Sequence, residues 1–414
     1  MRPWLIGLLL LALLIAAAAV FFRAELQRLR YQRSLFTGAP QHEHFVRQED
    51  YYPVNEMPAA PTPVAFLAGP ALALPRTFEH RGATLETAAF LERTDTAALL
   101  VLHRGAVRHE SYALSGGPEI PWLTHSVSKS LVATAVGIAL RKGLIAQLSD
   151  PIDRYVPALA GSGYAGVSIL DVLQMASGIR WNEDYADRES DLNRFGAVMF
   201  RGDSYDAFVA QRVRERPPGE YHSYVGMNSQ ALTMLVRAVT GESLATFLSR
   251  ELWSPLGAQD RAYWSTDRFG VELGLGGLSA SARDLAKVGE LYRKGGQWQG
   301  TTLLDAAFVK SATSVTAAHL ARGPNPASAH RMGYGYHWWL PDGDEQDYSA
   351  IGIYNQFVYV SPAHDAVIVK LSAYRDYATS HEPSAYLEAE TFSLLRALAR
   401  LAASEGNGDR IAGY

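Results

Sequence analysis

The stretch Thr124-His125-Ser126-Val127-Ser128-Lys129-Ser130 decides how the rest of the chain is interpreted. It leads into residues 130–141, a strongly apolar run that predicts a helix ending at Gly143. A serine and a lysine three residues apart on a helix lie on one face, about one turn from each other. A neutral lysine amine in that position can accept the serine proton, and the start of the helix offers backbone N–H groups to a developing oxyanion.

The spacing by itself is a weak signal, because a serine three residues before a lysine arises by chance about once in a chain of this length. Lysine is scarce in this sequence, however, and Lys129 is the only one with a serine at that distance. Whether Ser126 is a nucleophile and Lys129 its base therefore depends on the sequence around them.

An ordered series of blocks follows the motif along the chain. The blocks are SILDVLQMASGIRWNEDY at 168–185, PPGEYHSYVGMNSQ at 217–230, GGLSASARDLA at 276–286, GGQWQG at 295–300 and GYGYHWW at 333–339. Together with S-x-x-K, they resemble the serine β-lactamase and penicillin-binding-protein superfamily. The likeness is greatest to its class C-like branch of esterases, D-aminopeptidases and 6-aminohexanoate-dimer (nylon oligomer) hydrolases, and it extends over about residues 84–401.

This resemblance implies a catalytic group of three residues. Ser126 would be the nucleophile, Lys129 its partner, and Tyr224 the phenol that carries the proton from the serine to the leaving group. Tyr221 is a rival three residues earlier, but Tyr224 has the family's spacing to the following block residues Asn228 and Gln230.

The third family element departs from its usual pattern. The superfamily has K-T-G or H-T-G on an edge strand, whereas the matching stretch here is Ala350-Ile351-Gly352-Ile353. The resemblance implies that the N–H of Ile353 joins that of Ser126 in the oxyanion hole, and that Gly352 contacts substrate. Because Ala350 replaces the cation that helps hold substrate carboxylates in β-lactam enzymes, efficient penicillin turnover is not expected.

The loop that contains Tyr185 is acidic and aromatic. In the nylon oligomer hydrolases, a tyrosine on the corresponding loop closes over bound substrate, so the resemblance makes Tyr185 a substrate-binding residue. The loop could equally be a solvated surface segment, and both interpretations stand at this point.

The likeness implies an α/β fold of the β-lactamase/transpeptidase-like type, with an antiparallel sheet flanked by the terminal helices and an inserted helical subdomain. The residue pattern agrees, since strand-like segments lie near both ends and helical periods lie between them. Residues 97–103 and 106–112 predict a hairpin turning at Arg104-Gly105. The other expected elements are strands at 336–340, 356–360 and 366–371 and helices at 84–93, 169–175, 231–239, 282–292 and 385–401.

Four segments are expected along the chain: a membrane anchor or signal segment at 1–22, a linker at 23–78, a hydrolase domain at 79–402 and a tail at 403–414. Residues 50–75 are rich in proline and alanine, which predicts either an extended linker or a segment that lies on the domain surface.

The uncharged run WLIGLLLLALLIAAAAVFF at 4–22 nearly spans a bilayer core of about 30 Å. We favour an uncleaved single-pass anchor over a secretory signal, although Ala16–Ala19 could hold a cleavage site. The arginines after the run would place the body in the cytoplasm by the positive-inside rule. The short Met-Arg start resembles an export signal instead. Since the superfamily's usual substrates lie outside the inner membrane, we expect a periplasmic catalytic domain held at that membrane.

Composition excludes several other classes. The chain of 414 residues has a formal net charge of −4 and a pI near 6.3, so nothing indicates nucleic-acid binding. It has no cysteine, hence no disulfide, thiolate metal site or cysteine nucleophile. No metal-ligand spacing or nucleotide-binding glycine motif is present, and no metal or cofactor is expected.

The resemblance therefore implies a metal-independent serine hydrolase that acts on small amides or esters through an acyl-enzyme. A D-peptide or cell-wall carboxypeptidase is the alternative among enzymes. A membrane-anchored pseudoenzyme that binds a ligand without turnover is the alternative from another class.

Overall fold

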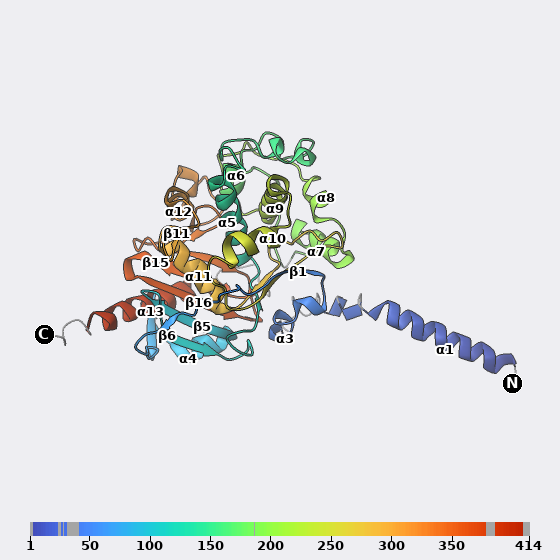
Figure 1. Cartoon of the computed structure of the whole chain (residues 1–414), viewed down its shortest axis with the longest axis horizontal. Helices are drawn as coiled ribbons and strands as arrows, with labels where there is room; N and C mark the ends of the chain where they lie inside the picture. The colour runs from blue at the N-terminus through green and yellow to red at the C-terminus, as the bar shows by residue number, and fades with distance from the viewer. Residues whose placement is uncertain are drawn as a thin grey trace.

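A computed structural model describes residues 3–23, 26–27, 29–30, 41–185, 187–377 and 386–408 (Figure 1). Its main sheet has eight strands, antiparallel except where β2 pairs with β6. In spatial order they are β12 (Gly333–Tyr334), β13 (Trp339–Leu340), β14 (Tyr348–Gly352), β15 (Gln356–Ser361), β16 (Ala366–Ser372), β5 (Thr96–His103), β6 (Ala106–Tyr112) and β2 (Leu67–Ala68).

A second sheet of four strands lies between the main sheet and the helical region. Its strands in order are β1 (Val54–Met57), β8 (Ala262–Ser265), β9 (Leu278–Ala280) and β7 (Trp122–Leu123). Two further strand pairs are β3 (Thr77–His80) with β4 (Ala83–Glu86), and β10 (Gln297–Trp298) with β11 (Thr301–Thr302).

The helices lie mostly in the middle of the chain. They are α1 (Pro3–Phe21), α3 (Gln41–Phe45), α4 (Thr87–Arg93), α5 (Val127–Arg141), α6 (Ile169–Leu173), α7 (Asp191–Arg201), α8 (Tyr205–Val209), α9 (Gly226–Thr240), α10 (Leu244–Leu248), α11 (Ala282–Arg293), α12 (Ala306–Ala312) and α13 (Glu388–Gly408). Short turns of helix are η1 (Gln48–Asp50), η2 (Ile152–Arg154), η3 (Pro157–Leu159), η4 (Ser249–Trp253), η5 (Ala318–Leu320) and η6 (Pro362–His364).

The predicted hairpin forms as β5 and β6, and it is the point where the two ends of the chain meet. Arg104 and Gly105 both have positive φ angles, as a tight two-residue hairpin turn requires. On its other side β5 pairs with β16, more than two hundred residues later. One sheet is therefore built from both ends of the chain, as the pattern of strands and helices indicated.

The side chains of β5 point alternately into two hydrophobic cores, one on each face of the sheet. Leu99 and Val101 belong to a cluster that includes Leu395 and Leu398 of α13. Leu100 and neighbours on the same face belong to the larger cluster that contains α5, α9 and α11. Successive strand residues point to opposite faces, and every position from Ala97 to His103 is buried because both faces are covered. Figure 1 shows helices on both sides of the sheet.

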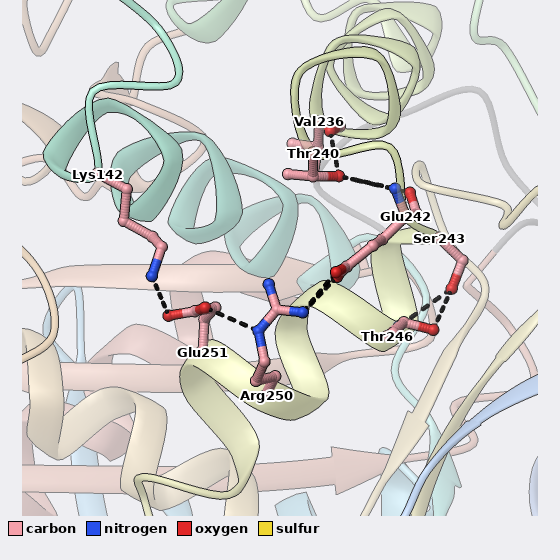
Figure 2. A network of polar contacts seen from close by, with 8 residues as sticks. All are labelled: Lys142, Val236, Thr240, Glu242, Ser243, Thr246, Arg250 and Glu251. Carbon is pink, nitrogen blue, oxygen red and sulfur yellow. Dashed lines mark hydrogen bonds and ion pairs between the residues drawn. The ribbon is translucent and has the colours of Figure 1, made fainter.

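The far ends of α5 and α9 are joined by a chain of polar contacts (Figure 2). Lys142, directly after α5, donates to Glu251 at 2.9 Å. Arg250 donates to the same Glu251 at 2.9 Å and to Glu242, just after α9, at 2.5 and 2.7 Å. Both helices begin near the candidate site, and these partly exposed ion pairs link their opposite ends.

The N-terminal run forms α1, which is long and apolar enough to cross a membrane and has no buried residue. It projects away from the body in Figure 1. A signal sequence near the N-terminus would have the same character. Part of the arginine-rich stretch that follows lies outside the described residues.

Part of the expected linker at 23–78 joins the folded body instead. Residues Val54–Met57 pair with β8, and Phe45 and Met57 are fully buried. Proline and alanine content predicted a tether or a surface segment. Tyr52, Met57 and Leu72 are buried against the domain, whereas Leu67 is 79% exposed, so the stretch lies along the surface of the body. The expected tail at 403–414 also begins too early, because α13 continues to Gly408.

Two local expectations were wrong. Residues 84–86 belong to β4, so the helix begins only at Thr87. The strand expected over 336–340 is reduced to β13, because His337 adopts a positive φ of 58° that interrupts an extended backbone.

Candidate active site

Ser126 lies between β7 and the first turn of α5. The residue before it, His125, has a φ of 49°, an unusual conformation for a residue with a side chain. Ser126 remains partly accessible, whereas the first helical residues behind it are buried. The strained turn therefore presents one hydroxyl at the surface of an otherwise buried helix end.

Lys129 is 1% exposed, and its amine contacts the serine. Its Nζ donates to Ser126 Oγ at 2.8 Å and to the carbonyl of Leu275 at 2.6 Å. Burial lowers the pKa of Lys129 to about 8, although the nearby Glu183 carboxylate opposes the fall. A substantial fraction of the amine is therefore neutral near pH 8 and within reach of the serine proton.

The loop that supplies the Leu275 carbonyl is held by Gln230. The Gly274 N–H donates to Gln230 Oε1 at 2.9 Å, and Gln230 Nε2 donates to the Glu272 carbonyl at 3.0 Å. A Cβ on Gly274 would lie 2.0 Å from Thr233 Oγ1, so the loop approaches α9 as closely as only glycine allows. Gln230 thus positions one of the two hydrogen-bond acceptors of Lys129.

Tyr224 lies beside the serine and the lysine. Its ring centroid is 5.0 Å from Lys129 Nζ, and the Ser126 hydroxyl is among the groups that act on the pKa of its phenol. On its other face the ring stacks on Trp339, 5.3 Å away. Burial and the Glu183 carboxylate raise the pKa of Tyr224 well above its usual value, so the phenol keeps its proton.

The rival Tyr221 has a different environment. Its ring lies under the Arg216 guanidinium at 4.3 Å. Asn228, which sets the family spacing, is buried and accepts hydrogen bonds from Tyr164 and Ser177 at 2.9 and 2.8 Å. Tyr224 is therefore the tyrosine of this segment that contacts Ser126, and Asn228 stabilises the segment from behind.

The end of β14 packs directly on the backbone that leads to the nucleophile. A Cβ on Gly352 would lie 2.3 Å from the Thr124 carbonyl oxygen, so only glycine fits there. Ile353 follows at once, and Tyr354 and Asn355 turn the chain back with φ angles of 64° and 72°. The structure thereby places Ile353 next to the Ser126 turn, where the sequence resemblance expects it.

The turn after Ile353 is tied to a second buried lysine. Lys370 Nζ donates to Asn355 Oδ1 at 2.7 Å, and to Ser372 Oγ and Thr94 Oγ1 at 2.5 and 3.1 Å. Thr391 of α13 donates to the same Asn355 oxygen at 3.1 Å. Burial lowers the pKa of Lys370 well below its usual value. The strained turn is therefore anchored to β16 and to the C-terminal helix.

Glu183 is the residue of this site that our sequence analysis missed. Its carboxylate accepts from Trp181 Nε1 at 2.6 Å, from the Gly226 N–H at 3.0 Å and from Tyr185 Oη at 3.3 Å. Burial raises its pKa, while the Lys129 amine lowers it. Nothing in the sequence distinguished Glu183 from the other acidic residues of the loop 181–191. Only the fold brings it to Gly226, the first residue of α9, which lies two residues after Tyr224.

Tyr185, the predicted substrate-binding tyrosine, lies in the same cluster. Its hydroxyl donates to Glu183, and burial together with that carboxylate raises its pKa well above the usual value. The structure thus brings Tyr185, Ser126, Lys129 and Tyr224 to one site. Within the part of the chain that the structure describes, no three histidine, aspartate or glutamate side chains group as metal ligands.

Comparisons with known proteins agree with this geometry. The Beta-lactamase family profile matches residues 74–392. The 6-aminohexanoate-dimer hydrolase of Paenarthrobacter ureafaciens is 36% identical over 299 residues, which are 70% of this chain and 76% of that protein. A candidate 6-aminohexanoate-dimer hydrolase from Bacillus anthracis superposes with a TM-score of 0.77 at 20% identity, covering 88% of this chain and 95% of that one.

A family VIII carboxylesterase superposes with a TM-score of 0.56 at 18% identity, covering 76% of this chain and 95% of the other. The β-lactamase/transpeptidase-like fold expected from the sequence is confirmed, and so is the likeness to the nylon oligomer hydrolases.

The Glu183 carboxylate is expected to set the pH at which Ser126 becomes reactive. In the wild type, the rate of Ser126 labelling by a fluorophosphonate should rise with pH through a midpoint near 8, because only the neutral Lys129 amine accepts a proton. Glu183→Gln keeps an acceptor for the Gly226 N–H but removes the charge that favours the ammonium, so the midpoint should move to lower pH.

Glu189→Gln is the matched control, since Glu189 lies on the same loop with an exposed side chain paired to Arg194. Its midpoint should equal that of the wild type. An unchanged or higher midpoint in Glu183→Gln would contradict the assignment.

Proposed function

The chain belongs to the beta-lactamase family, and on that premise we propose that it is a serine hydrolase that cleaves small amides or esters through an acyl-enzyme. The observation that carries the proposal is the 2.8 Å contact between the buried Lys129 amine and Ser126 Oγ. One of the two acceptors of Lys129 is a hydroxyl that remains partly exposed, whereas the acceptors of the buried Lys370 all lie in the interior.

In the acylation step, Ser126 Oγ attacks the substrate carbonyl carbon and its proton passes to the neutral Lys129 amine. The new ammonium faces the Tyr224 ring, which stabilises a cation at that distance. As the bond to the leaving group breaks, the Tyr224 phenol donates its proton to the departing amine or alcohol and regains one from Lys129. The raised pKa of Tyr224 suits a donor that stays protonated between turnovers.

Deacylation repeats these steps with water as the nucleophile. Water gives its proton to the same basic group and attacks the acyl carbon, and Ser126 Oγ leaves as a hydroxyl. In both steps we assign the oxyanion to the N–H groups of Ser126 and Ile353, supported by the close approach of Gly352 to the Thr124 carbonyl.

We assign Tyr185 and Gly352 to substrate binding. In support, Tyr185 contacts Glu183, which acts on Lys129, and Gly352 packs against the Thr124 carbonyl, two residues before the serine. The named relatives hydrolyse an amide dimer and carboxylic esters, which supports a small acyl substrate over a long peptide. A D-peptide carboxypeptidase is the alternative reaction on the same site. The contact between Lys129 and Ser126 argues against a pseudoenzyme. Rates on p-nitrophenyl esters, amide dimers and D-Ala-D-Ala peptides discriminate among the substrate classes.

Ser126→Ala should abolish hydrolysis of an activated ester and labelling by a fluorophosphonate, with an unchanged circular dichroism spectrum. Lys129→Ala should lose a similar share of the activity, because the effects of removing members of one catalytic group are not additive. Lys142→Ala is the control on the same helix, since its amine pairs with Glu251 at the far end, and it should keep wild-type kcat. Residual activity above a few per cent in Ser126→Ala would reject the nucleophile.

Tyr224→Phe should lower kcat/KM for an amide substrate by about 10²–10⁴-fold, the usual effect of losing general acid–base help. The ring and its stacking on Trp339 are retained, so stability should change little. Tyr221→Phe should stay within a few-fold of the wild type. A larger loss in Tyr221→Phe would reverse the assignment, and equal small losses would mean that Lys129 acts alone.

Turnover of β-lactams should be poor. Ala350 is 1% exposed and supplies no cation where such substrates present a carboxylate. A missing charge-assisted contact costs about 1.5–3 kcal/mol. Nitrocefin should be cleaved at least tenfold less efficiently than the best ester, and the reverse order would refute this.

We propose that α1 anchors the catalytic domain to the periplasmic face of the inner membrane. Its length, composition and lack of buried residues support an anchor. Alkaline phosphatase fused after Gln41 should be active and should sediment with membranes. An inactive phosphatase, with an active cytoplasmic reporter at the same position, would reverse the orientation. Soluble periplasmic activity would indicate a cleaved signal.

A further inference from the structure

The segment between α1 and β2 contains a contact that the proposed chemistry does not explain. Phe45, the last residue of α3, is fully buried although it precedes the family match at 74–392. Its ring contacts three others: Trp122 at 5.4 Å, His125 at 4.8 Å and Tyr354 at 5.3 Å between centroids. These distances are those of edge-on aromatic packing.

Two of these partners flank the assigned oxyanion donors. His125 immediately precedes Ser126, and Tyr354 immediately follows Ile353. Both have positive φ angles, 49° and 64°, and their rings lie 5.0 Å apart. Residues with side chains hold such conformations only where their surroundings impose them. Phe45 packs against both rings and so contributes to holding both turns.

The third ring that Phe45 contacts, Trp122, links the same two parts of the structure. Trp122, in β7, donates its Nε1 to Gln356 Oε1 at 3.1 Å. Gln356 starts β15, directly after the turn that contains Tyr354. Phe45 therefore touches the strand before the nucleophile turn and the turn after β14, and the Trp122–Gln356 hydrogen bond joins the same two elements.

Phe45 is itself held in place by the segment that follows it. Residues Val54–Met57 pair with β8. Arg261 donates to Glu49 at 2.6 and 2.8 Å, and Asn55 donates to Glu272 at 2.7 Å. The segment is thus bound to the second sheet at several points and presents Phe45 to the site from one direction.

We propose that Phe45 is a positioning residue that fixes the backbone turns at Ser126 and Ile353 relative to each other, so that the segment leading from α1 is part of the catalytic unit. The inference rests on the proposed function, since it concerns the oxyanion hole of that reaction. Loss of the Phe45 ring leaves a cavity beside the His125 and Tyr354 rings, into which both turns can shift. A shift of about 1 Å between catalytic groups can cost roughly 10²-fold in rate.

The test compares Phe45→Ala with the wild type on a p-nitrophenyl ester. We expect kcat per folded molecule to fall at least tenfold with KM changed less than threefold, because substrate contacts are untouched. Phe45→Leu, which keeps most of the volume, should fold and give an intermediate kcat. The matched control is Phe78→Ala, because Phe78 is also buried but packs against Phe90 in the cluster beneath the sheet. It should lose stability and keep kcat.

The possible outcomes are distinct. If the wild type neither hydrolyses esters nor reacts with a fluorophosphonate at Ser126, the proposed function itself fails. If the wild type is active and Phe45→Ala loses no more kcat than Phe78→Ala, or loses activity only through KM or the folded fraction, the positioning role is wrong. If Phe45→Ala does not fold, wild-type kcat in Phe45→Leu overturns the proposal, and a reduced kcat in Phe45→Leu supports it.

Discussion

The proposed mechanism depends on one buried amine, that of Lys129, losing its proton. Burying a charged ammonium as deeply as Lys129 is buried costs several kcal/mol unless other groups compensate. Burial therefore favours the neutral amine. The Leu275 carbonyl and Ser126 Oγ accept its hydrogen bonds, and Glu183 limits how far its pKa falls. Three elements from different parts of the chain surround the Lys129 amine: the Leu275 loop, the Tyr224 ring and the Glu183 loop.

Lys370 shows why burial alone does not identify such a group. It is as buried as Lys129, and desolvation lowers its pKa as well. Its amine, however, donates to Thr94, Asn355 and Ser372, which are all interior side chains. Lys370 therefore acts as a structural cross-link. The difference between the two lysines lies in whether one acceptor is a hydroxyl that substrate can reach.

Local sequence was sufficient where structure is set by neighbours in the chain. The β5–β6 hairpin, α5 and the pairing of Ser126 with Lys129 follow from residue alternation, a glycine turn and a one-turn spacing. Glu183 could not be predicted, because its importance comes from Gly226 and Lys129, which lie far away in sequence. Phe45 was hidden for a related reason. It stands among the polar residues 41–50, ahead of the proline- and alanine-rich stretch, and only the folded body shows which rings it contacts.

The contact between Asn355 and Thr391 has a consequence for the moment at which the protein becomes active. The turn after Ile353 is held by β16 and by the C-terminal helix, while Ser126 is supplied by the first third of the chain. β5 also stays without its β16 neighbour until residues beyond 366 have been made. A nascent chain on the ribosome therefore carries Ser126 and Lys129 long before it has the turn after Ile353. Under the proposed mechanism, the site is complete only when the last helix has docked against that turn.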